Sequence, residues 1–375
     1  MEKYFKGLYV RFSKSQKARF IEDRKKHSTS LKNLKFSDKI LGEFYDNYYK
    51  PTFFEFLYNV KTIIYSDNVF EFITKQDMED WDLYSYLKPL IDEKIIKVSK
   101  NGKVILLKKE IEKFIPKPQT VKQIKAAIEK KLKIKAKDKQ AVINLFKKFD
   151  GFKVKAEWDQ MPISAESAFF VVEKILAKIP FNKKFLLVGD DDFISVILTL
   201  ADPSIECLAI DIDAQLLKCI DILAKKFKLK IKTKKVDLSE KKDLKENFVG
   251  FLANPVYTEA GVKEFVKFGI SQLGKDGGFV LLEVGDEAIG NRFLFLQEFF
   301  AKNNLVIDEL ILNKVYYPHI KLYEEDKIIF KRMTEFIDKK TIEKSPKLGA
   351  SLYVFNYLGK RPKRVKFDKP FYAYL

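Results

Sequence analysis

Cysteine and histidine are scarce in this 375-residue chain, which holds two of each. Cys207 and Cys219 are too few for a disulfide framework, and both fall inside apolar segments, so we expect buried thiols. His27 has no acidic or cysteine neighbour and is interpreted as a surface residue, while His319 follows a proline in an aromatic loop. Without clustered ligands, no bound metal is expected.

Long apolar runs are also missing. None approaches the roughly 20 residues of a membrane-spanning helix, and the opening MEKYFKGLYVRF lacks the layout of a signal peptide. We therefore expect a cytoplasmic protein with no membrane partner. The length allows two domains, and abundant lysine together with 34 phenylalanines favours a thermophilic source.

Positive charge is plentiful but unevenly distributed. The net charge is +19, of which residues 1–150 contribute +14, residues 151–330 contribute −3 and residues 331–375 contribute +8. The middle segment is therefore slightly acidic within a basic protein. This balance favours a cationic ligand in that segment and makes nucleic acid an unlikely partner there.

Residues 1–118 are predicted to form a helical domain with a short hairpin. Residues 51–75 carry apolar residues at helical spacing, and Asn101-Gly102 separates two short apolar runs, which is a strong hairpin signal. Helices followed by a basic hairpin are similar to a winged-helix module. DNA binding by this module is disfavoured because the expected reading helix lacks an Arg/Asn/Gln-rich face.

Three further segments complete the predicted organisation. Residues 114–118, FIPKP, look like the end of the first domain and a linker, and residues 119–150 are predicted to be a basic helical linker. Its lysines are expected to face solvent, with an electrostatic contact to RNA or a partner as the alternative. Residues 151–330 are the expected catalytic domain, and the basic, aromatic tail at residues 331–375 is expected to be a mobile lid or an arm onto a partner chain.

The catalytic domain is organised around residues 185–200, FLLVGDDDFISVILTL, which predict a buried strand, a glycine turn and an apolar helix. A phosphate-binding turn presents N–H groups and avoids carboxylates. The aspartates that follow Gly189, namely Asp190, Asp191 and Asp192, therefore predict a cationic ligand at the end of this strand.

Repeated βα units indicate an α/β fold with a parallel, doubly wound sheet. Strands are predicted at residues 185–188, 206–210, 231–236, 250–253, 278–283 and 306–312. Ser164 is expected to begin a helix over residues 165–179, and the preceding Asp159-Gln160 would face the ligand crevice. Asp211, at the end of the second strand, would bind ribose hydroxyls, and Asp237 would lie near an adenine amino group.

The fourth strand runs into Asn254-Pro255-Val256-Tyr257, which resembles the [DN]PPY signature of enzymes that transfer a group from S-adenosylmethionine to an amine nitrogen. In that motif the Asn or Asp holds the amine and the aromatic ring stacks against the acceptor. Val256 stands in place of the second proline. The alternative interpretation is a strand end stopped by proline.

The aspartates argue against an intact S-adenosylmethionine, because its carboxylate would be repelled. Two like charges at 4 Å and an effective dielectric of 20 cost on the order of 4 kcal/mol. Decarboxylated S-adenosylmethionine carries an aminopropyl ammonium instead, which the acids would attract. The same acids would bind a polyamine acceptor.

With these motifs together, most of residues 45–330 resembles the branched-chain polyamine synthase family, N4-bis(aminopropyl)spermidine synthase; the matching stretches are DQMPISAES, VGDDD, AIDID and NPVYTEAG. The resemblance implies a Rossmann-like, methyltransferase-type sheet with an N-terminal winged-helix-like domain. It also implies aminopropyl transfer from decarboxylated S-adenosylmethionine to the secondary amine of spermidine, release of methylthioadenosine, and a homodimer.

The expected roles of the site residues follow from this chemistry. Asp191 is the leading catalytic base with Asp190 as the alternate, and Tyr257 would pack against the methylene chain. The residues assigned to the acceptor are Asp192, Asn254, Pro255 and Glu259, and those assigned to the nucleoside are Gly189, Asp211 and Asp237. Two other functions stay open: an N-methyltransferase acting on nucleic acid, and a non-catalytic DNA-binding regulator that senses a polyamine.

Overall fold

The computed structural model describes residues 1–27, 37–72, 80–132, 155, 160–180, 184–240, 244, 246–318, 324–344 and 346–363. The chain forms two compact units, one of Met1–Lys117 with Gly359–Leu375, and one of Pro118–Leu358. The first division falls inside the predicted linker at residues 114–118, and the second falls inside the predicted tail. Asp159 and His319 lie outside the described residues.

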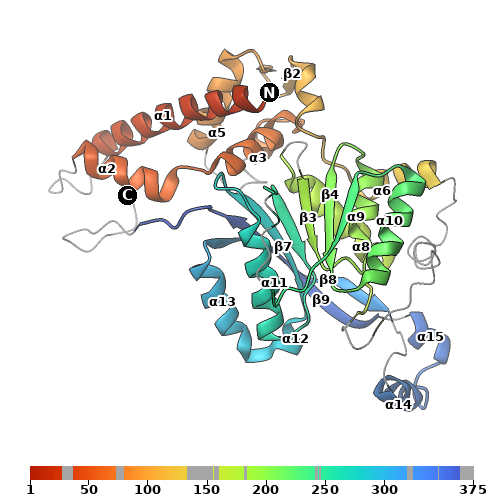
Figure 1. Ribbon diagram of the computed structural model, residues 1–375. Coiled ribbons are helices and arrows are strands. Elements are labelled where there is room, and N and C mark those ends of the chain that lie inside the picture. The colour runs from red at the N-terminus through yellow and green to blue at the C-terminus, as the bar shows by residue number, and fades with distance from the viewer. Residues whose placement is uncertain are drawn as a thin grey trace. The chain divides into compact units, whose positions relative to one another are not determined.

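The first unit consists of helices and one hairpin (Figure 1). Its elements are α1 (Glu2–His27), α2 (Asp38–Phe44), the π-helix η2 (Tyr45–Tyr49), α3 (Phe53–Ile64), α5 (Asp80–Asp92), β1 (Ile96–Val98), β2 (Val104–Leu106) and the 3-10 helix η3 (Lys109–Lys113). Strands β1 and β2 pair antiparallel, and Gly102 between them has a φ of 81°. The hairpin is confirmed, and the winged-helix interpretation stays a prediction.

Aromatic side chains and a helix cap stabilise this unit. The Phe12 and Phe56 rings lie 5.0 Å apart, and Tyr86 packs against both. The hydroxyl of Thr52 accepts a hydrogen bond from the N–H of Glu55, while the Glu55 carboxylate accepts one from the N–H of Thr52. This reciprocal pair satisfies two N–H groups at the start of α3 that have no partner inside the helix.

The second unit is built from a sheet with helices on both faces. Its helices are α6 (Val121–Leu132), α8 (Ala165–Lys178), α9 (Ile194–Ala201), α10 (Ala214–Phe227), α11 (Glu259–Ser271), α12 (Asp286–Ile289), the 3-10 helix η6 (Gly290–Arg292), α13 (Phe293–Lys302), α14 (Glu324–Met333) and α15 (Lys339–Lys344). Its strands are β3 (Lys184–Val188), β4 (Glu206–Asp211), β5 (Ile231–Lys235), β6 (Gly250–Ala253), β7 (Gly278–Val284), β8 (Leu305–Pro318) and β9 (Pro346–Tyr357).

The seven strands follow the order β5-β4-β3-β6-β7-β9-β8. Strands β3 to β7 are parallel, and β9 is antiparallel to both β7 and β8. Strand β8 therefore runs in the same direction as the parallel set. This Rossmann-like, doubly wound, methyltransferase-type sheet confirms the predicted α/β class, and the order reverses direction between β3 and β6, where such sheets bind ligands.

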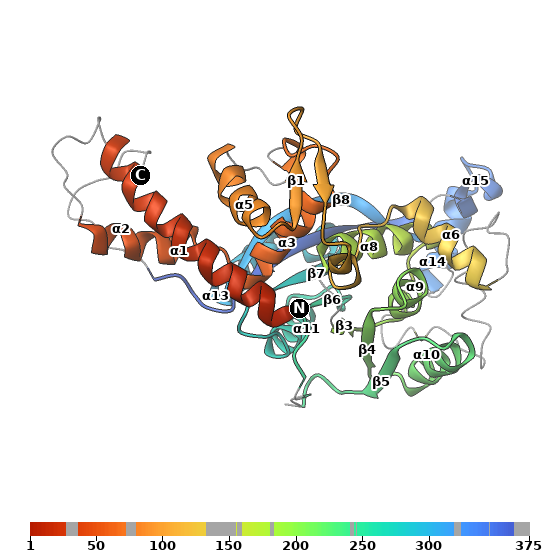
Figure 2. The same cartoon turned by 90° about the horizontal axis from the view of Figure 1, so that it is seen from above.

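The helices separate to the two faces of this sheet. Helices α8, α9 and α10 cover one face, while α11 and α13 cover the other (Figure 1), and the view from above shows the same separation (Figure 2). Because both faces are covered, the central strands are nearly continuous apolar runs, and every residue of β6 and β7 is buried. The predicted helix start at Ser164 is confirmed, since its hydroxyl accepts from the N–H of Ser167.

Strand β9 is the main difference from the sequence prediction. The sequence predicts a tail at residues 331–375, yet residues 346–357 form the strand between β7 and β8. The run SLYVFNY has the β-branched and aromatic composition of a strand, and the lysine and proline around it concealed that signal. Helix α6 also belongs to the second unit, with Ile124 and Ile128 buried, so this part of the expected linker is packed.

Two smaller expectations concern membranes and thiols. Within the described ranges, no helix is both long enough and apolar enough to cross a membrane. Cys207 and Cys219 are free and buried, as predicted. They lie on β4 and α10, whose apolar residues contribute to the core of the second unit.

Helix α11 packs very closely on β6 at Gly269, which makes this glycine a test of the core. A Cβ at Gly269 would lie 2.3 Å from a ring carbon of Phe251. We expect Gly269→Ala to lower the free energy of unfolding by about 1–3 kcal/mol in chemical denaturation, since the packed ring must move. Gly274→Ala is the control, because no atom lies within 4 Å of that Cβ. Equal losses in the two variants would contradict the close packing.

Candidate active site

The acid turn, residues 189–192, joins β3 to α9 at the carboxyl end of a central strand. Gly189 has a φ of 79°, and a Cβ there would lie 3.0 Å from the backbone oxygen of Asn254. Glycine is therefore required both by the left-handed backbone and by the approach of the next strand. Phe193, with a φ of 55°, precedes the first residue of α9. This tight connection holds three aspartates together.

Asp190 points away from the ligand side of the turn. Its carboxylate accepts hydrogen bonds from the N–H of Ser195, at 3.2 Å, and from the Ser195 hydroxyl, in the first turn of α9. Burial raises the pKa of Asp190 to about 8, although the bonds from Ser195 oppose this shift. The geometry therefore gives Asp190 a structural setting and makes it the weaker candidate for the base.

The side-chain amide of Asn254 bridges the carboxylates of Asp191 and Asp192. The side-chain nitrogen of Asn254 donates to Asp191 at 3.2 Å and to Asp192 at 2.9 Å. Asp192 also accepts from the backbone N–H of Ile163 at 2.6 Å, which ties the turn to the segment before α8. Both carboxylates are buried, so these donors offset part of their mutual repulsion.

A cavity of about 650 Å³ opens beside this turn. It lies at the carboxyl ends of β3, β4, β5 and β6, and its volume is in the range of small-molecule sites. Seven of the ten predicted site residues line it, namely Gly189, Asp191, Asp211, Asp237, Asn254, Pro255 and Tyr257. Gln160 also lines it, which confirms the prediction that this residue faces the crevice.

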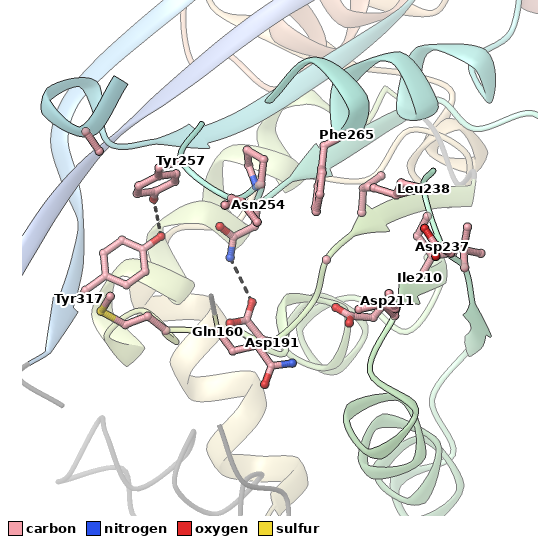
Figure 3. Close-up of a pocket in the computed structure, with 18 of the residues that line it drawn as sticks. Gln160, Asp191, Ile210, Asp211, Asp237, Leu238, Asn254, Tyr257, Phe265 and Tyr317 are labelled. Carbon is pink, nitrogen blue, oxygen red and sulfur yellow. Dashed lines mark hydrogen bonds between the residues drawn. The ribbon is translucent and has the colours of Figure 1, made fainter. Parts of the chain in front are cut away.

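The cavity has two differently composed sides (Figure 3). Asp211 and Asp237 lie on one side, near Ile210 and Leu238, whereas Asp191, Asn254, Tyr257 and Tyr317 lie on the other. The ring of Phe265 lies between the two sides. One side thus offers two acids with apolar neighbours at the ends of β4 and β5, and the other offers an acid, an amide and two phenols.

The strand-end acids of the first side are held by local bonds. Asp211 accepts from the N–H of Asp213 at 2.8 Å, and burial raises its pKa. Asp213 is fully buried and binds the Lys155 ammonium at 2.9 Å and the Gln160 amide at 3.1 Å. Asp237 accepts from the N–H and hydroxyl of Ser239. These contacts leave Asp211 and Asp237 oriented on the cavity wall.

Tyr257 meets a partner that the sequence did not reveal. Its hydroxyl lies 2.6 Å from the hydroxyl of Tyr317, and the rings meet edge-on at 86°. Burial raises the pKa of both Tyr257 and Tyr317 well above the usual value, so both stay neutral phenols. Tyr317 was missed because β8 was predicted to end at residue 312, six residues before Pro318, where it ends.

Two predicted acceptor residues lie outside the cavity lining. Asp192 accepts hydrogen bonds from the backbone N–H of Ile163 and the side chain of Asn254, and its neighbour Asp191 lines the cavity instead. Glu259, the first residue of α11, forms an ion pair with Lys263 one turn later. The structure therefore brings Asp192 into the acid cluster and does not bring Glu259 to the cavity.

Glu283 is an acid of this region that the sequence analysis did not single out. It lies in β7, is fully buried, and neither carboxylate oxygen has a hydrogen-bond partner among the described residues. Burial, followed by the charges of Asp191 and Asp190, raises the pKa of Glu283 to about 8. A signal was present in the sequence, since GFVLLEV contains one charged residue inside an apolar strand.

Comparison with known proteins identifies a family. The family described as "Branched-chain polyamine synthase A C-terminal domain" matches residues 144–365. An uncharacterized protein of Methanocaldococcus jannaschii is 39% identical over 138 residues, which are 36% of this chain and 35% of that protein. The match thus spans about a third of the length of this relative.

Two solved structures are similar in fold. A branched-chain polyamine synthase from Thermus thermophilus, in complex with N4-aminopropylspermidine and 5'-methylthioadenosine, has a TM-score of 0.46 and 16% identity over 88% of this chain and 93% of that chain. A putative RNA methyltransferase from Pyrococcus horikoshii has a TM-score of 0.41 and 15% identity over 59% of this chain and all of that chain. At these TM-scores and identities, the two structures do not indicate the activity of this chain.

The state of Glu283 predicts how stability depends on pH. Its pKa rises from 4.5 in the unfolded chain to about 8 in the fold, so the folded protein binds the extra proton between these values. The free energy of unfolding therefore falls as pH rises from 4.5 to 8. The Glu283→Gln variant lacks this loss. Its free energy of unfolding relative to the wild type should therefore rise by about 2 kcal/mol or more from pH 5 to pH 8.

This prediction is checked by urea denaturation at pH 5, 6.5 and 8. Glu298→Gln is the control, because Glu298 is 56% exposed and pairs with Lys302 on the surface of α13. Its stability should follow that of the wild type across the range. Parallel pH profiles for wild type and Glu283→Gln would contradict a buried, proton-bearing Glu283.

Proposed function

The chain belongs to the branched-chain polyamine synthase family, and from this premise we propose that it is an aminopropyltransferase. Its donor is decarboxylated S-adenosylmethionine and its acceptor is the secondary amine of spermidine. The products are the branched-chain polyamine N4-bis(aminopropyl)spermidine and methylthioadenosine. The observation that carries the proposal is the Asp191 carboxylate, which lines the cavity and is oriented by Asn254 at 3.2 Å.

The charge of the site supports this choice of donor. Asp191 and Asp192 lie buried at the carboxyl end of β3, so an amino-acid carboxylate on the donor would meet like charge there. The aminopropyl group of the decarboxylated donor brings an ammonium instead. Asp211 and Asp237 would hold the nucleoside, and the Phe265 ring and the apolar strand ends would pack against it.

The reaction that fits these residues is a single displacement. The spermidine secondary amine is protonated in water and must lose its proton before it can attack, and Asp191 would accept that proton. The nitrogen lone pair then forms a bond to the carbon beside the sulfonium. The carbon–sulfur bond breaks, and its electron pair neutralises the sulfonium as methylthioadenosine leaves. This displacement needs no metal, and repeating it adds the second aminopropyl group.

The two tyrosines would orient the acceptor rather than take part in bond making. Tyr257 and Tyr317 line the cavity and hold each other through their hydroxyls. Their rings offer apolar faces to the methylene chain, and cation–π attraction to an ammonium adds about 0.5–2 kcal/mol. The donor, the acceptor and the base would thus meet at near-attack geometry.

Donor choice tests the proposal against a methyltransferase. The protein is incubated with spermidine and either decarboxylated or intact S-adenosylmethionine, and methylthioadenosine and S-adenosylhomocysteine are measured. We expect methylthioadenosine from the decarboxylated donor alone, because only this donor lacks the repelled carboxylate. S-adenosylhomocysteine from the intact donor, without methylthioadenosine from the other, would reject the aminopropyl reaction and favour an N-methyltransferase.

The role of Asp191 is tested by removing its ability to accept a proton. Asp191→Asn should reduce the turnover number roughly 100-fold or more, which is the scale of a general base. Asp276→Asn is the control, because Asp276 is exposed in the loop that enters β7 at the opposite end of the sheet. Near-native turnover by Asp191→Asn would show that a group other than Asp191 accepts the proton.

A further inference from the structure

Glu283 has a position that a purely structural role does not explain. Leu282 of β7 is in register with Ala253 of β6. Glu283 is the residue after Leu282, and Asn254 is the residue after Ala253. Side chains at matching positions of parallel strands leave the same face of the sheet, so Glu283 and Asn254, each one residue beyond the last paired residues of β6 and β7, lie on the same face next to one another. Glu283 thus flanks the amide that holds the acid turn.

The burial of Glu283 is costly in the protein as it stands. Both oxygens lie out of reach of solvent and of every hydrogen-bond donor in the described chain. A buried polar group without a hydrogen-bond partner destabilises the fold, and an apolar residue at this point of β7 would avoid that cost. A buried, unpartnered carboxyl group of this kind is expected to have a functional use.

The groups facing Glu283 are acids and phenols. The acid turn contributes Asp190 and Asp191, whose charges act on Glu283 directly. The segment after β6 contributes Tyr257, and β8 contributes Tyr317, and the charge of Glu283 acts on both phenols. The residue opposite Glu283 on β9 is Leu352, which is apolar and fully buried. Asp190 and Asp191 therefore disfavour a negative charge on Glu283, and the two neutral phenols add no positive charge to offset it.

Two more carboxylates and one ammonium complete the neighbourhood. Asp192 acts on Tyr257 and Tyr317 together with Glu283, and Asp211 acts on Asp190 from the end of β4. The Lys155 ammonium binds Asp213 on the nucleoside side at 2.9 Å. A polyamine bound at Asp191 would add positive charge on the other side, where the acids are concentrated.

We propose that Glu283 is a proton-releasing acid of this site, which holds its proton while the cavity lacks a cation and loses it when a polyamine ammonium binds beside Asp191. The inference rests on the proposed function, since it needs a cationic ligand. The added charge stabilises the Glu283 carboxylate, and the proton passes to solvent. Polyamine affinity then rises with pH, by up to about tenfold per pH unit where one proton is released.

Proton release is measured by titration calorimetry with spermidine at pH 7.5. The binding enthalpy is compared in phosphate and Tris, whose different ionisation enthalpies report the number of protons transferred. With a pKa of about 8, Glu283 is protonated in roughly three quarters of free molecules at this pH. We expect the wild type to release about half a proton or more beyond the Glu283→Gln variant. Any proton lost by spermidine itself cancels in this difference.

Infrared difference spectra provide a measurement that does not depend on the variant. The carbonyl band of protonated carboxylic acids should decrease when spermidine is added to the wild type, and it should decrease equally in Asp190→Asn, which lacks the other carboxyl group whose pKa is raised to about 8. Glu298→Gln is the matched control for calorimetry and should release as many protons as the wild type.

The outcomes separate this inference from the proposed function. Equal proton release by wild type and Glu283→Gln, with spermidine bound by both, overturns the inference and leaves the aminopropyl reaction standing. A wild type that does not bind spermidine rejects the proposed acceptor and the inference with it. If Glu283→Gln does not fold, Asp190→Asn removes the other carboxyl group whose pKa is raised to about 8, and an acid band that does not decrease when spermidine binds to this variant overturns the inference.

Discussion

The second unit depends on how the fold accommodates several carboxyl groups in one buried place. Asp190, Asp191 and Asp192 are consecutive, so the backbone alone keeps them close. The fold supplies donors from three different segments, namely the first turn of α9, the residue before Ser164 and the end of β6. Without these donors the repulsion among the acids would oppose the tight turn after β3.

The donors also give the three acids different states. Asp190 faces Ser195 inside the fold, Asp192 is shared between a backbone N–H and Asn254, and Asp191 keeps a face on the cavity. The proposed reaction would use one carboxylate that can exchange a proton and others that only contribute charge. Burial and hydrogen bonding would divide these tasks among three residues that are the same type and adjacent in the sequence.

Part of this arrangement was predictable. The strand, glycine turn and helix around Gly189, the hairpin at Asn101-Gly102 and the strands from β3 to β7 rest on local patterns that the structure reproduces. Strand β9 was missed because lysine and proline flank it. A residue that is close to a motif in the sequence need not lie in the site. Glu259 follows Asn254 closely in sequence and yet pairs with Lys263 outside the cavity.

The sequence by itself determined that acids, a glycine turn and an amine-type motif stand at strand ends, because adjacent residues and strand periodicity decide such features. Only the tertiary structure decided which aspartate faces the cavity and which other residues join it. Tyr317 meets Tyr257 across 60 residues, and Glu283 lies beside Asn254 through the pairing of two strands. Strand order and register set these contacts, and no local pattern encodes them.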